Sequence, residues 1–161
     1  MKSYANMIID RHWDGYIPVD IEDIVRKEGI YLESIPDRDA YQYSGIASID
    51  DYGRKVISIS HNIHYNRRRF TIAHELGHHV LQHVTPEFPK HRDNDYSFSG
   101  NNDDWIEVEA NRFAAEVLMP DIAIDYMIRR EGVTDISDLA RAFEVSEQAM
   151  YYRMLNLGYI R

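Results

Sequence analysis

Two histidines and a glutamate form the most chemically suggestive pattern in the sequence. They lie in the segment His74-Glu75-Leu76-Gly77-His78, an HExxH motif. If the segment is helical, successive residues turn by about 100°, so His74 and His78 lie one turn apart on one face and can bind one cation. Glu75 lies beside that face, where a carboxylate can take a proton from a metal-activated water. The motif predicts a hydrolytic metal site in which Glu75 is the general base.

A metal at this site must be held by histidine and carboxylate side chains. The 161 residues include eight His and no Cys, which excludes disulfides, thiol nucleophiles and cysteine-bound zinc or iron–sulfur clusters. A catalytic zinc ion keeps three protein ligands and leaves one position for water, so a third ligand is required. Two histidines and a carboxylate suit Zn²⁺, and the same set also suits other divalent ions.

Candidates for the third ligand lie on a second apolar-rich segment, residues 105–119. Glu107 precedes Asn111 by four residues, so the two side chains share one helix face, with two alanines beside them that leave room for another helix. Glu109 projects about 200° away from Glu107. Helical phase therefore favours Glu107 as the ligand and leaves Glu109 as the alternative. Asn111 is then the expected partner for the far nitrogen of a ligand histidine.

The elements around these residues follow from periodicity and turn signals. Asp20 is the expected N-cap of a helix, and residues 85–104 have the turn-rich character of a functional loop or a disordered segment. No repeat or linker is visible, so the sequence predicts one α+β domain with a small antiparallel sheet or hairpin, made of residues 1–64, 65–120 and 121–161. The expected elements are helices at 3–13 and 20–28, a strand at 31–35, a hairpin of 43–50 and 54–60, the motif helix from 65 to just before 85, a helix at 105–119 and three short helices within 121–161.

Composition excludes several classes of protein. With 44% hydrophobic and 28% charged residues, the chain is typical of a folded protein, and no uncharged apolar run approaches the roughly 18 residues of a membrane helix. Asp10 and Asp14 stand where a signal peptide needs an apolar core, so we expect a cytoplasmic protein. The 18 basic and 27 acidic residues leave a net charge of −9, which argues against wrapping a phosphate backbone.

The C-terminal segment from Thr134 to Gly158 has the pattern of a helix-turn-helix, with a turn at 144–145 and a cap at Ser146. Its second helix is expected to expose Arg153 as a single cation, and residues 121–161 hold five Arg against seven acids. That balance is poor for phosphate contact. Packing or protein docking is the expected role, and direct DNA binding is not.

Several polar residues leave alternatives open. His79 and His83 repeat the HxxxH spacing without an adjacent carboxylate at ligand spacing, which favours surface or supporting roles over a second zinc site. The run from Arg67 to Arg69 could hold an acidic substrate segment, although such a run more often forms a solvated face. A donor for the tetrahedral oxyanion is also required, and the candidates are Tyr41, Tyr43, His91 and Tyr96.

The two motif segments resemble those of the ImmA/IrrE family of bacterial and phage metallopeptidases. The chain reads RRRFTIAHELGHHVLQH and then EVEANRFAAEVLMP, and the likeness is strong over residues 65–120. The resemblance implies a zincin-like fold, with His74, His78 and Glu107 as zinc ligands, Glu75 as general base and Asn111 as companion of Glu107. It also implies a substrate, because family members commonly cleave a helix-turn-helix repressor, often encoded beside them in mobile elements or stress-response operons.

Two functions therefore follow from the sequence. The first is a zinc-dependent endopeptidase that cuts one or few protein substrates, such as a repressor encoded nearby. The second is a regulatory binding protein that holds a partner through its C-terminal helices and uses the metal as a structural or sensing element. The intact Glu75 favours the enzyme, because a purely structural metal site needs no general base.

Overall fold

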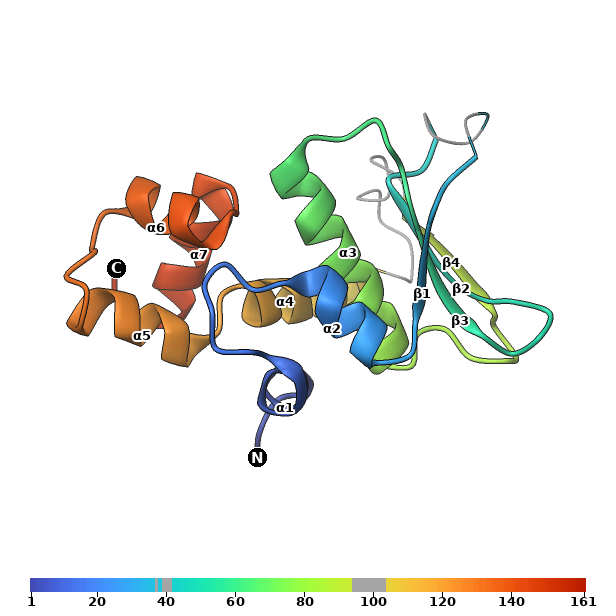
Figure 1. The fold of residues 1–161 in the computed structure, drawn as a ribbon, viewed down its shortest axis with the longest axis horizontal. Coiled ribbons are helices and arrows are strands. Elements are labelled where there is room, and N and C mark those ends of the chain that lie inside the picture. The colour runs from blue at the N-terminus through green and yellow to red at the C-terminus, as the bar shows by residue number, and fades with distance from the viewer. Residues whose placement is uncertain (37, 39–41, 94–103) are drawn as a thin grey trace.

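A computed structural model describes residues 1–36, 38, 42–93 and 104–161. Within these residues the chain forms a small sheet and a larger set of helices (Figure 1). The elements are α1 (Tyr4–His12), α2 (Ile21–Lys27), β1 (Tyr31–Ser34), β2 (Gly45–Ile49), β3 (Lys55–Ile59), α3 (Tyr65–Val80), β4 (Lys90–Asp93), α4 (Asp104–Leu118), α5 (Asp121–Arg129), α6 (Ile136–Phe143) and α7 (Glu147–Asn156).

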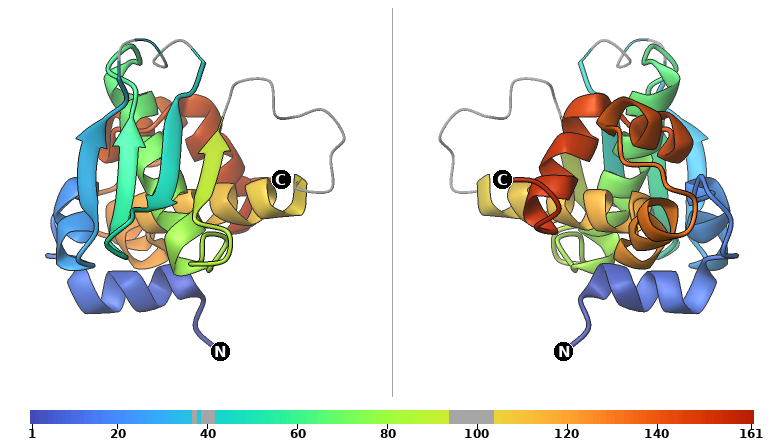
Figure 2. Two further views of the ribbon diagram at one scale, coloured as in Figure 1. Left: turned by 90° about the vertical axis from the view of Figure 1, so that its right-hand side faces the viewer. Right: turned by 90° about the vertical axis from the view of Figure 1, so that its left-hand side faces the viewer.

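The sheet has the strand order β1-β3-β2-β4, visible face-on in the left view of Figure 2. β2 and β3 form the predicted antiparallel hairpin, in which Ala47 is opposite Ile57. β4 pairs antiparallel with the free side of β2, whereas β1 pairs parallel with β3. β1 and β4 therefore form the two edges of the sheet.

The helix α3 lies against the sheet, and α4 crosses α3 on the side away from the sheet (Figure 1). The sheet contributes buried Ile57 and Ile59 to the interface, and α3 contributes Ile72 and Leu76. Phe113 on α4 joins the same core. The α3–α4 pair is thus the centre of the fold, and residues on its inner faces are shielded from water.

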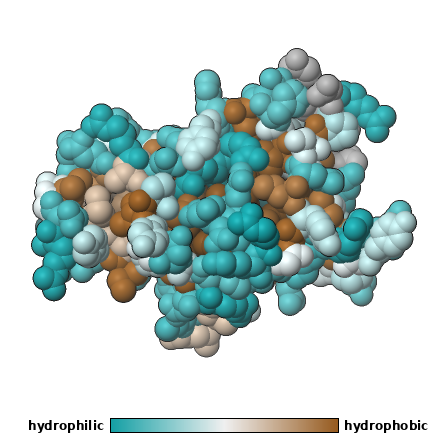
Figure 3. All heavy atoms as spheres, in the orientation of Figure 1, coloured by the Kyte–Doolittle hydropathy of each residue, from teal (hydrophilic) through white to brown (hydrophobic). Residues whose placement is uncertain are grey.

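The last three helices, α5, α6 and α7, gather on the opposite side of α4 from the sheet (Figure 1). The contact between α6 and α7 is made by buried apolar side chains, among them Leu139, Phe143 and Met150. The turn between them places Glu144 in the left-handed conformation, with φ of 54°. Polar side chains cover most of the face drawn in Figure 3, and apolar ones show over these helices and between the helices and the sheet.

The α+β class, the hairpin, the helices and two caps are confirmed. The Asp20 side chain accepts a hydrogen bond from the backbone N–H of Asp23, and Ser146 caps α7 through the N–H of Ala149. Two details need correction: β1 makes the sheet mixed, not wholly antiparallel, and β4 lies inside the predicted loop 85–104. The single-domain division stays a prediction. Among the described residues no helix is long and apolar enough to cross a membrane.

Candidate metal centre

Three side chains converge where α4 crosses α3. The Nε2 atoms of His74 and His78 lie 3.0 Å apart. The carboxylate of Glu107 reaches both rings, with Oε2 at 3.0 Å from His74 Nε2 and Oε1 at 3.3 Å from His78 Nε2. One ligand atom from each residue lies within 4.8 Å of the others. The structure therefore brings together the two motif histidines and the glutamate favoured by helical phase.

The spacing of these atoms suits a tetrahedral divalent ion. Zinc bonds to histidine nitrogen and carboxylate oxygen are about 2.0–2.2 Å long, which places neighbouring ligand atoms about 3.3 Å apart in a tetrahedron. The two Nε2 atoms are 3.0 Å apart, and each lies 3.0–3.3 Å from one of the two carboxylate oxygens of Glu107. Two neutral imidazoles and one carboxylate are also the donor types of catalytic zinc sites. The three residues thus fit the metal that the sequence predicts, and their roles as ligands stay predictions.

Asn111 positions the first ring. Its Oδ1 lies 2.8 Å from Nδ1 of His74, and a carbonyl oxygen can only accept a hydrogen bond. The proton of His74 must therefore be on Nδ1 in this contact, which leaves the lone pair of Nε2 directed toward Glu107 and His78. This is the arrangement that supports a metal-binding imidazole.

His83 contacts the ring of His78 because of the turn that ends α3. Gln82 takes the left-handed conformation, with φ of 60°. The N–H of His83 then bonds to the carbonyl of His78 at 2.9 Å, and the N–H of Gln82 bonds to the carbonyl of His79 at 3.2 Å. These two bonds define a Schellman motif. The turn returns the ring of His83 to the cluster, where its Nδ1 lies 2.9 Å from Nδ1 of His78.

Glu109 completes this chain of contacts. Its Oε2 lies 2.8 Å from Nε2 of His83, so Nε2 of His83 donates and its Nδ1 accepts. His78 must then carry its proton on Nδ1, which leaves its Nε2 free to bind a metal. The alternative ligand Glu109 is therefore placed behind His83, with no direct contact to the three-residue cluster among the described interactions. The contact with His78 agrees with the supporting role that the sequence offered for His83. The link to Glu109 was missed, because the sequence placed His83 within the helix.

A third imidazole reaches the cluster from β4. His91 Nε2 lies 2.5 Å from Oε1 of Glu107, and its ring is 4.1 Å from the ring of His78, centroid to centroid. Among the four candidates for an oxyanion donor, His91 is thus placed at the site. Tyr43 lies half-buried before β2, and Tyr41 and Tyr96 lie outside the described residues.

The side chain of Glu75, on α3, faces the sheet. It is fully buried, and β2 approaches it at Gly45, where an added Cβ would lie 2.7 Å from Oε1 of Glu75 and 2.8 Å from Cγ2 of Thr71. Only a glycine leaves room for this carboxylate. A similar close approach joins the two ligand helices, because a Cβ on Gly77 would lie 3.0 Å from Cδ1 of Phe113.

Burial and hydrogen bonding set the charge of the cluster. Burial lowers the pKa of His78 to about 3, against weaker opposing effects of Glu107. Burial alone would raise the pKa of Glu107, but hydrogen bonds from His74, His78 and His91 outweigh it and hold the pKa well below its usual range. The cluster therefore presents an ionised carboxylate and a neutral ring at His78, which are the protonation states that a divalent metal requires.

Three expectations about neighbouring residues are corrected. His79 is neither at the surface nor beside the cluster, because its Nε2 lies 2.9 Å from the carbonyl of Val56 in the core. Arg69 is buried and its Nη1 donates to the carbonyl of Val19 at 2.8 Å, so the arginine run is not a uniform solvated face. Arg153 is also buried.

The burial of Arg153 bears on DNA binding. Its Nε donates to the carbonyl of Met119 at 2.9 Å, because this side chain points from α7 toward the end of α4. The second helix of the helix-turn-helix-like pair therefore does not offer the cation that the sequence had assigned to phosphate contact. Tyr151 and Tyr152 on the same helix are exposed.

A mixed sheet over a histidine-bearing helix, with a carboxylate supplied by a second helix, is the arrangement of a metallopeptidase. Comparison with known families agrees with this class. Residues 28–155 match the model of the peptidase M78 family, described as the IrrE N-terminal-like domain. This match covers most of the chain, including α3 and α4, and the chain belongs to that family.

Among curated proteins, the chain is similar to the radiation response metalloprotease IrrE of Deinococcus radiodurans. The two are 29% identical over 141 residues, which cover 77% of this chain and 42% of the relative. The chain therefore spans less than half the length of that relative. The resemblance of the motif segments to the ImmA/IrrE family is confirmed by both comparisons.

Proposed function

We propose that this chain is a zinc-dependent endopeptidase that hydrolyses a peptide bond in a specific protein substrate, a helix-turn-helix transcriptional repressor. The observation that carries the peptidase proposal is the convergence of His74, His78 and Glu107 at ligand spacing. Glu75, which directly follows His74 in the sequence, is buried. Family membership supports metallopeptidase chemistry. Zinc follows from the donor types and their spacing, and a cytoplasmic location stays a prediction from the sequence.

The chemistry assigns a separate task to each residue. A divalent metal held by the three ligands would polarise the peptide carbonyl and lower the pKa of the attacking water toward about 7. The carboxylate of Glu75 accepts the proton of that water and delivers it to the amine nitrogen as the C–N bond breaks. Asn111 and His83 hold the two ligand rings in the tautomer that keeps Nε2 available.

Of the two oxyanion-donor candidates that the structure describes, His91 is the better placed. Its edge-strand position places the ring against Glu107 and over His78, so Nε2 is within the cluster that the reacting carbonyl must approach. Removing a single oxyanion donor typically lowers kcat by about 100- to 1,000-fold. We expect a His91→Phe variant to show a loss of this order while it still binds zinc.

The decisive variant is Glu75→Gln. Replacing the carboxylate by an amide removes the proton acceptor and preserves the size of the side chain, so zinc binding should persist and cleavage should stop. The measurement combines zinc content after dialysis with cleavage of the repressor encoded by the neighbouring gene, in the presence and absence of a chelator. Cleavage by the Gln variant, or by the chelated protein, would contradict the peptidase mechanism.

The binding-protein alternative has one observation in its favour. The α6–α7 pair presents exposed Tyr151 and Tyr152 on a face that is unsuited to DNA because Arg153 is buried. A regulatory module of this kind would form a stable complex with the repressor and leave it intact. Size-exclusion chromatography of the wild-type mixture therefore separates the two functions: fragments support the enzyme, and an undigested complex supports the binding module.

A further inference from the structure

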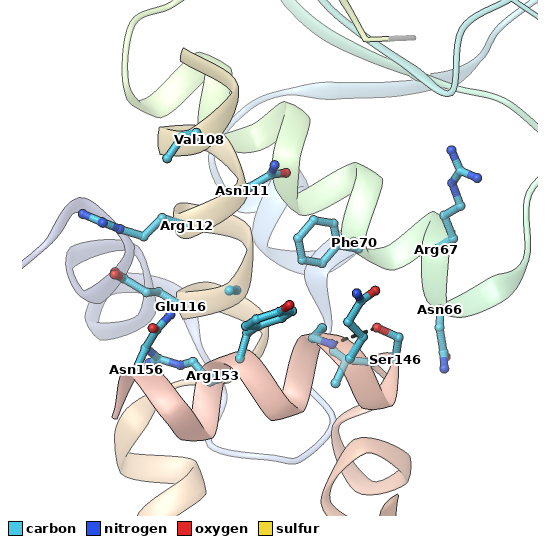
Figure 4. A pocket seen from close by; sticks show the side chains of 15 residues that line it. Asn66, Arg67, Phe70, Val108, Asn111, Arg112, Glu116, Ser146, Arg153 and Asn156 are labelled. Carbon is cyan, nitrogen blue, oxygen red and sulfur yellow. Dashed lines mark hydrogen bonds between the residues drawn. The ribbon is translucent and has the colours of Figure 1, made fainter. Parts of the chain in front are cut away.

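An open groove of about 1170 Å³ lies between α3, α4 and α7 (Figure 4). Its described lining comes from these three helices and from the turn before α7, and does not include the three residues of the metal cluster. We refer to this surface as the α3–α4–α7 groove. Its volume is above the roughly 300–1,000 Å³ of a typical small-molecule site, so it has room for several residues of a polypeptide.

Apolar side chains from all three helices line the groove. Phe70 on α3 and Tyr152 on α7 contribute aromatic rings, and Figure 4 shows the ring of Phe70 in the space between the helices. Ala115 on α4 and Ala149 on α7 add small side chains, which leave that space open. Tyr152 and Val108 are each more than half exposed. An apolar occupant would therefore remove from water a surface whose burial is favourable.

The charged side chains of the lining do not converge. Arg153 is buried and donates to the carbonyl of Met119, and Glu116 is near enough to interact with its charge. Figure 4 shows Arg67 and Arg112 turned away from each other, and Arg67 interacts with another group of the chain. Within the described lining, no set of cations therefore meets at one point, and the groove is not suited to selecting a charged occupant.

Most of the uncharged polar groups on the walls are carboxamides. They belong to Asn66, Asn111, Gln148 and Asn156. A carboxamide has two N–H donors and one carbonyl acceptor, which match the N–H and C=O groups that every peptide unit must satisfy. Walls of this kind can bind a main chain while the apolar side chains of that chain contact the aromatic rings. The lining therefore suits an uncharged polypeptide segment.

The groove is connected to the metal cluster through α4. Val108, which lines the groove, directly follows Glu107 in the sequence. Asn111 also lines the groove, and its Oδ1 contacts Nδ1 of His74. That contact uses only the carbonyl oxygen, so the two N–H donors of Asn111 can bind a carbonyl in the groove. The chain belongs to a peptidase family, and the molecule that must reach the cluster is therefore a polypeptide.

We propose that the α3–α4–α7 groove is a substrate subsite that binds an uncharged segment of the protein substrate with apolar side chains, and that Phe70 and Tyr152 select that segment. The proposal rests on the peptidase function proposed above. Apolar side chains of the segment pack on the two rings, and the carboxamides of the walls bond to its main chain. Substrates are then distinguished in part by an apolar segment that lies outside the metal cluster.

Fluorescence polarisation of labelled peptide pools tests the subsite on the Glu75→Gln protein, because binding does not require cleavage. One pool of short random peptides carries Leu, Ile and Phe among Ser, Asn and Gln. A second pool has Ser and Thr in place of the apolar residues, and a third has charged residues of either sign at those positions. We expect only the apolar pool to bind. Its affinity should change by less than about twofold between low and high salt, since salt screens interactions between charges.

Variants that empty or fill the groove locate the binding. Tyr152→Ala removes one ring and should weaken binding of the apolar pool by about fivefold or more, a loss typical of an aromatic anchor at an interface. Ala149→Phe fills the groove and should weaken binding at least as much, whereas Tyr152→Phe should preserve it because the contact is apolar. As a control, Tyr126→Ala removes a similarly exposed ring on α5, outside the groove lining, and should leave binding unchanged. Thermal unfolding checks that each variant is folded.

Equal binding of the three pools, no binding of the apolar pool, or unchanged binding by both Tyr152→Ala and Ala149→Phe would overturn the proposal. A concentration-dependent dimer, detected by light scattering and abolished by Ala149→Phe, would also overturn it, because the occupant would then be a second copy of the chain. Failure of the subsite is distinguishable from failure of the peptidase proposal. Chelator-sensitive cleavage without groove binding refutes only the subsite, whereas selective peptide binding by a protein that never cleaves its substrate refutes only the peptidase.

Discussion

Replacing His83 with Phe removes the acceptor for Nδ1 of His78 while keeping an aromatic ring of similar shape. The ring of His83 is packed edge-on against Trp105, with centroids 5.8 Å apart, and its side chain is only 4% exposed. A Phe ring occupies the same space and leaves little room for a water that could replace the lost contact. The variant therefore tests the hydrogen bond and not the volume.

The expected effect follows from the burial of the bond. His78 is completely buried, so its Nδ1–H has no access to bulk water once His83 is gone. An unsatisfied buried donor costs about 1–3 kcal/mol, and loss of a partner behind a metal ligand typically lowers metal affinity by about 10- to 100-fold. We expect zinc affinity to fall within that range.

Competition with a chromophoric chelator measures the zinc affinity, and the visible spectrum of the Co²⁺-substituted protein reports the ligand geometry. His83→Gln should recover part of the loss because its amide oxygen can accept the same bond. Glu109→Gln should lower affinity by less than about fivefold, because the carboxylate is half exposed and its contact with His83 is screened by water. Combining His83→Phe with Glu109→Gln should add nothing, since Glu109 acts through His83.

Control variants change the same groups away from the site. His64→Gln and Glu87→Gln alter exposed residues and should leave zinc affinity unchanged. If His83→Phe binds zinc within twofold of the wild type and has the same Co²⁺ spectrum, the relay from Glu109 to His78 does not support the ligand, and the reasoning from tautomers is wrong.

Three other perturbations test the site. Gly45→Ala should destabilise the fold by about 1–3 kcal/mol through overpacking. Because the added Cβ displaces Glu75, the variant should also cleave more slowly while it still binds zinc. Thermal unfolding, a cleavage assay and zinc titration measure these effects, and full cleavage activity would argue against the reasoning. Glu107→Ala should weaken zinc binding by more than about 100-fold, which exceeds the usual loss when a residue that hydrogen-bonds to a metal ligand is removed. Tight zinc binding by this variant, measured by calorimetry, would point to another ligand. In the metal-free protein the pKa of His78 is lowered to about 3 and burial also lowers that of His79. The unfolded state therefore binds more protons below pH 6.5, and the free energy of unfolding should fall with decreasing pH by up to about 1.4 kcal/mol per pH unit for each ring. Urea titrations from pH 7.5 to 4.5 measure this slope, and stability that stays constant over the range would refute the assignment of buried neutral rings.

Helical phase predicted much of the site. His74 and His78 share a face because four residues make slightly more than one turn, and the same phase placed Glu107 and Asn111 together on α4. The structure brings these four side chains into contact. What phase cannot show is that α4 crosses α3 at this position, since that depends on packing contacts such as Gly77 against Phe113.

The missed features depend on contacts between distant segments. β4 has the sequence Lys-His-Arg-Asp, with no apolar alternation to indicate a strand, and it becomes one by pairing with β2. His83 was assigned to the helix because no glycine marks the end of α3. The left-handed turn falls on Gln82, a residue type that seldom adopts this conformation, so its return toward His78 could not be read from residue types.

The separation of the two ligand helices along the chain has a consequence for biosynthesis. A nascent polypeptide that has emerged from the ribosome only as far as α3 carries both imidazoles and the proposed general base, but not the carboxylate that follows on α4. Truncated or prematurely terminated products ending before Glu107 therefore lack a complete coordination set. Under the proposed ligand set, the three ligands come together only after α4 has docked on α3, so the metal centre is a product of tertiary folding and not of either helix alone.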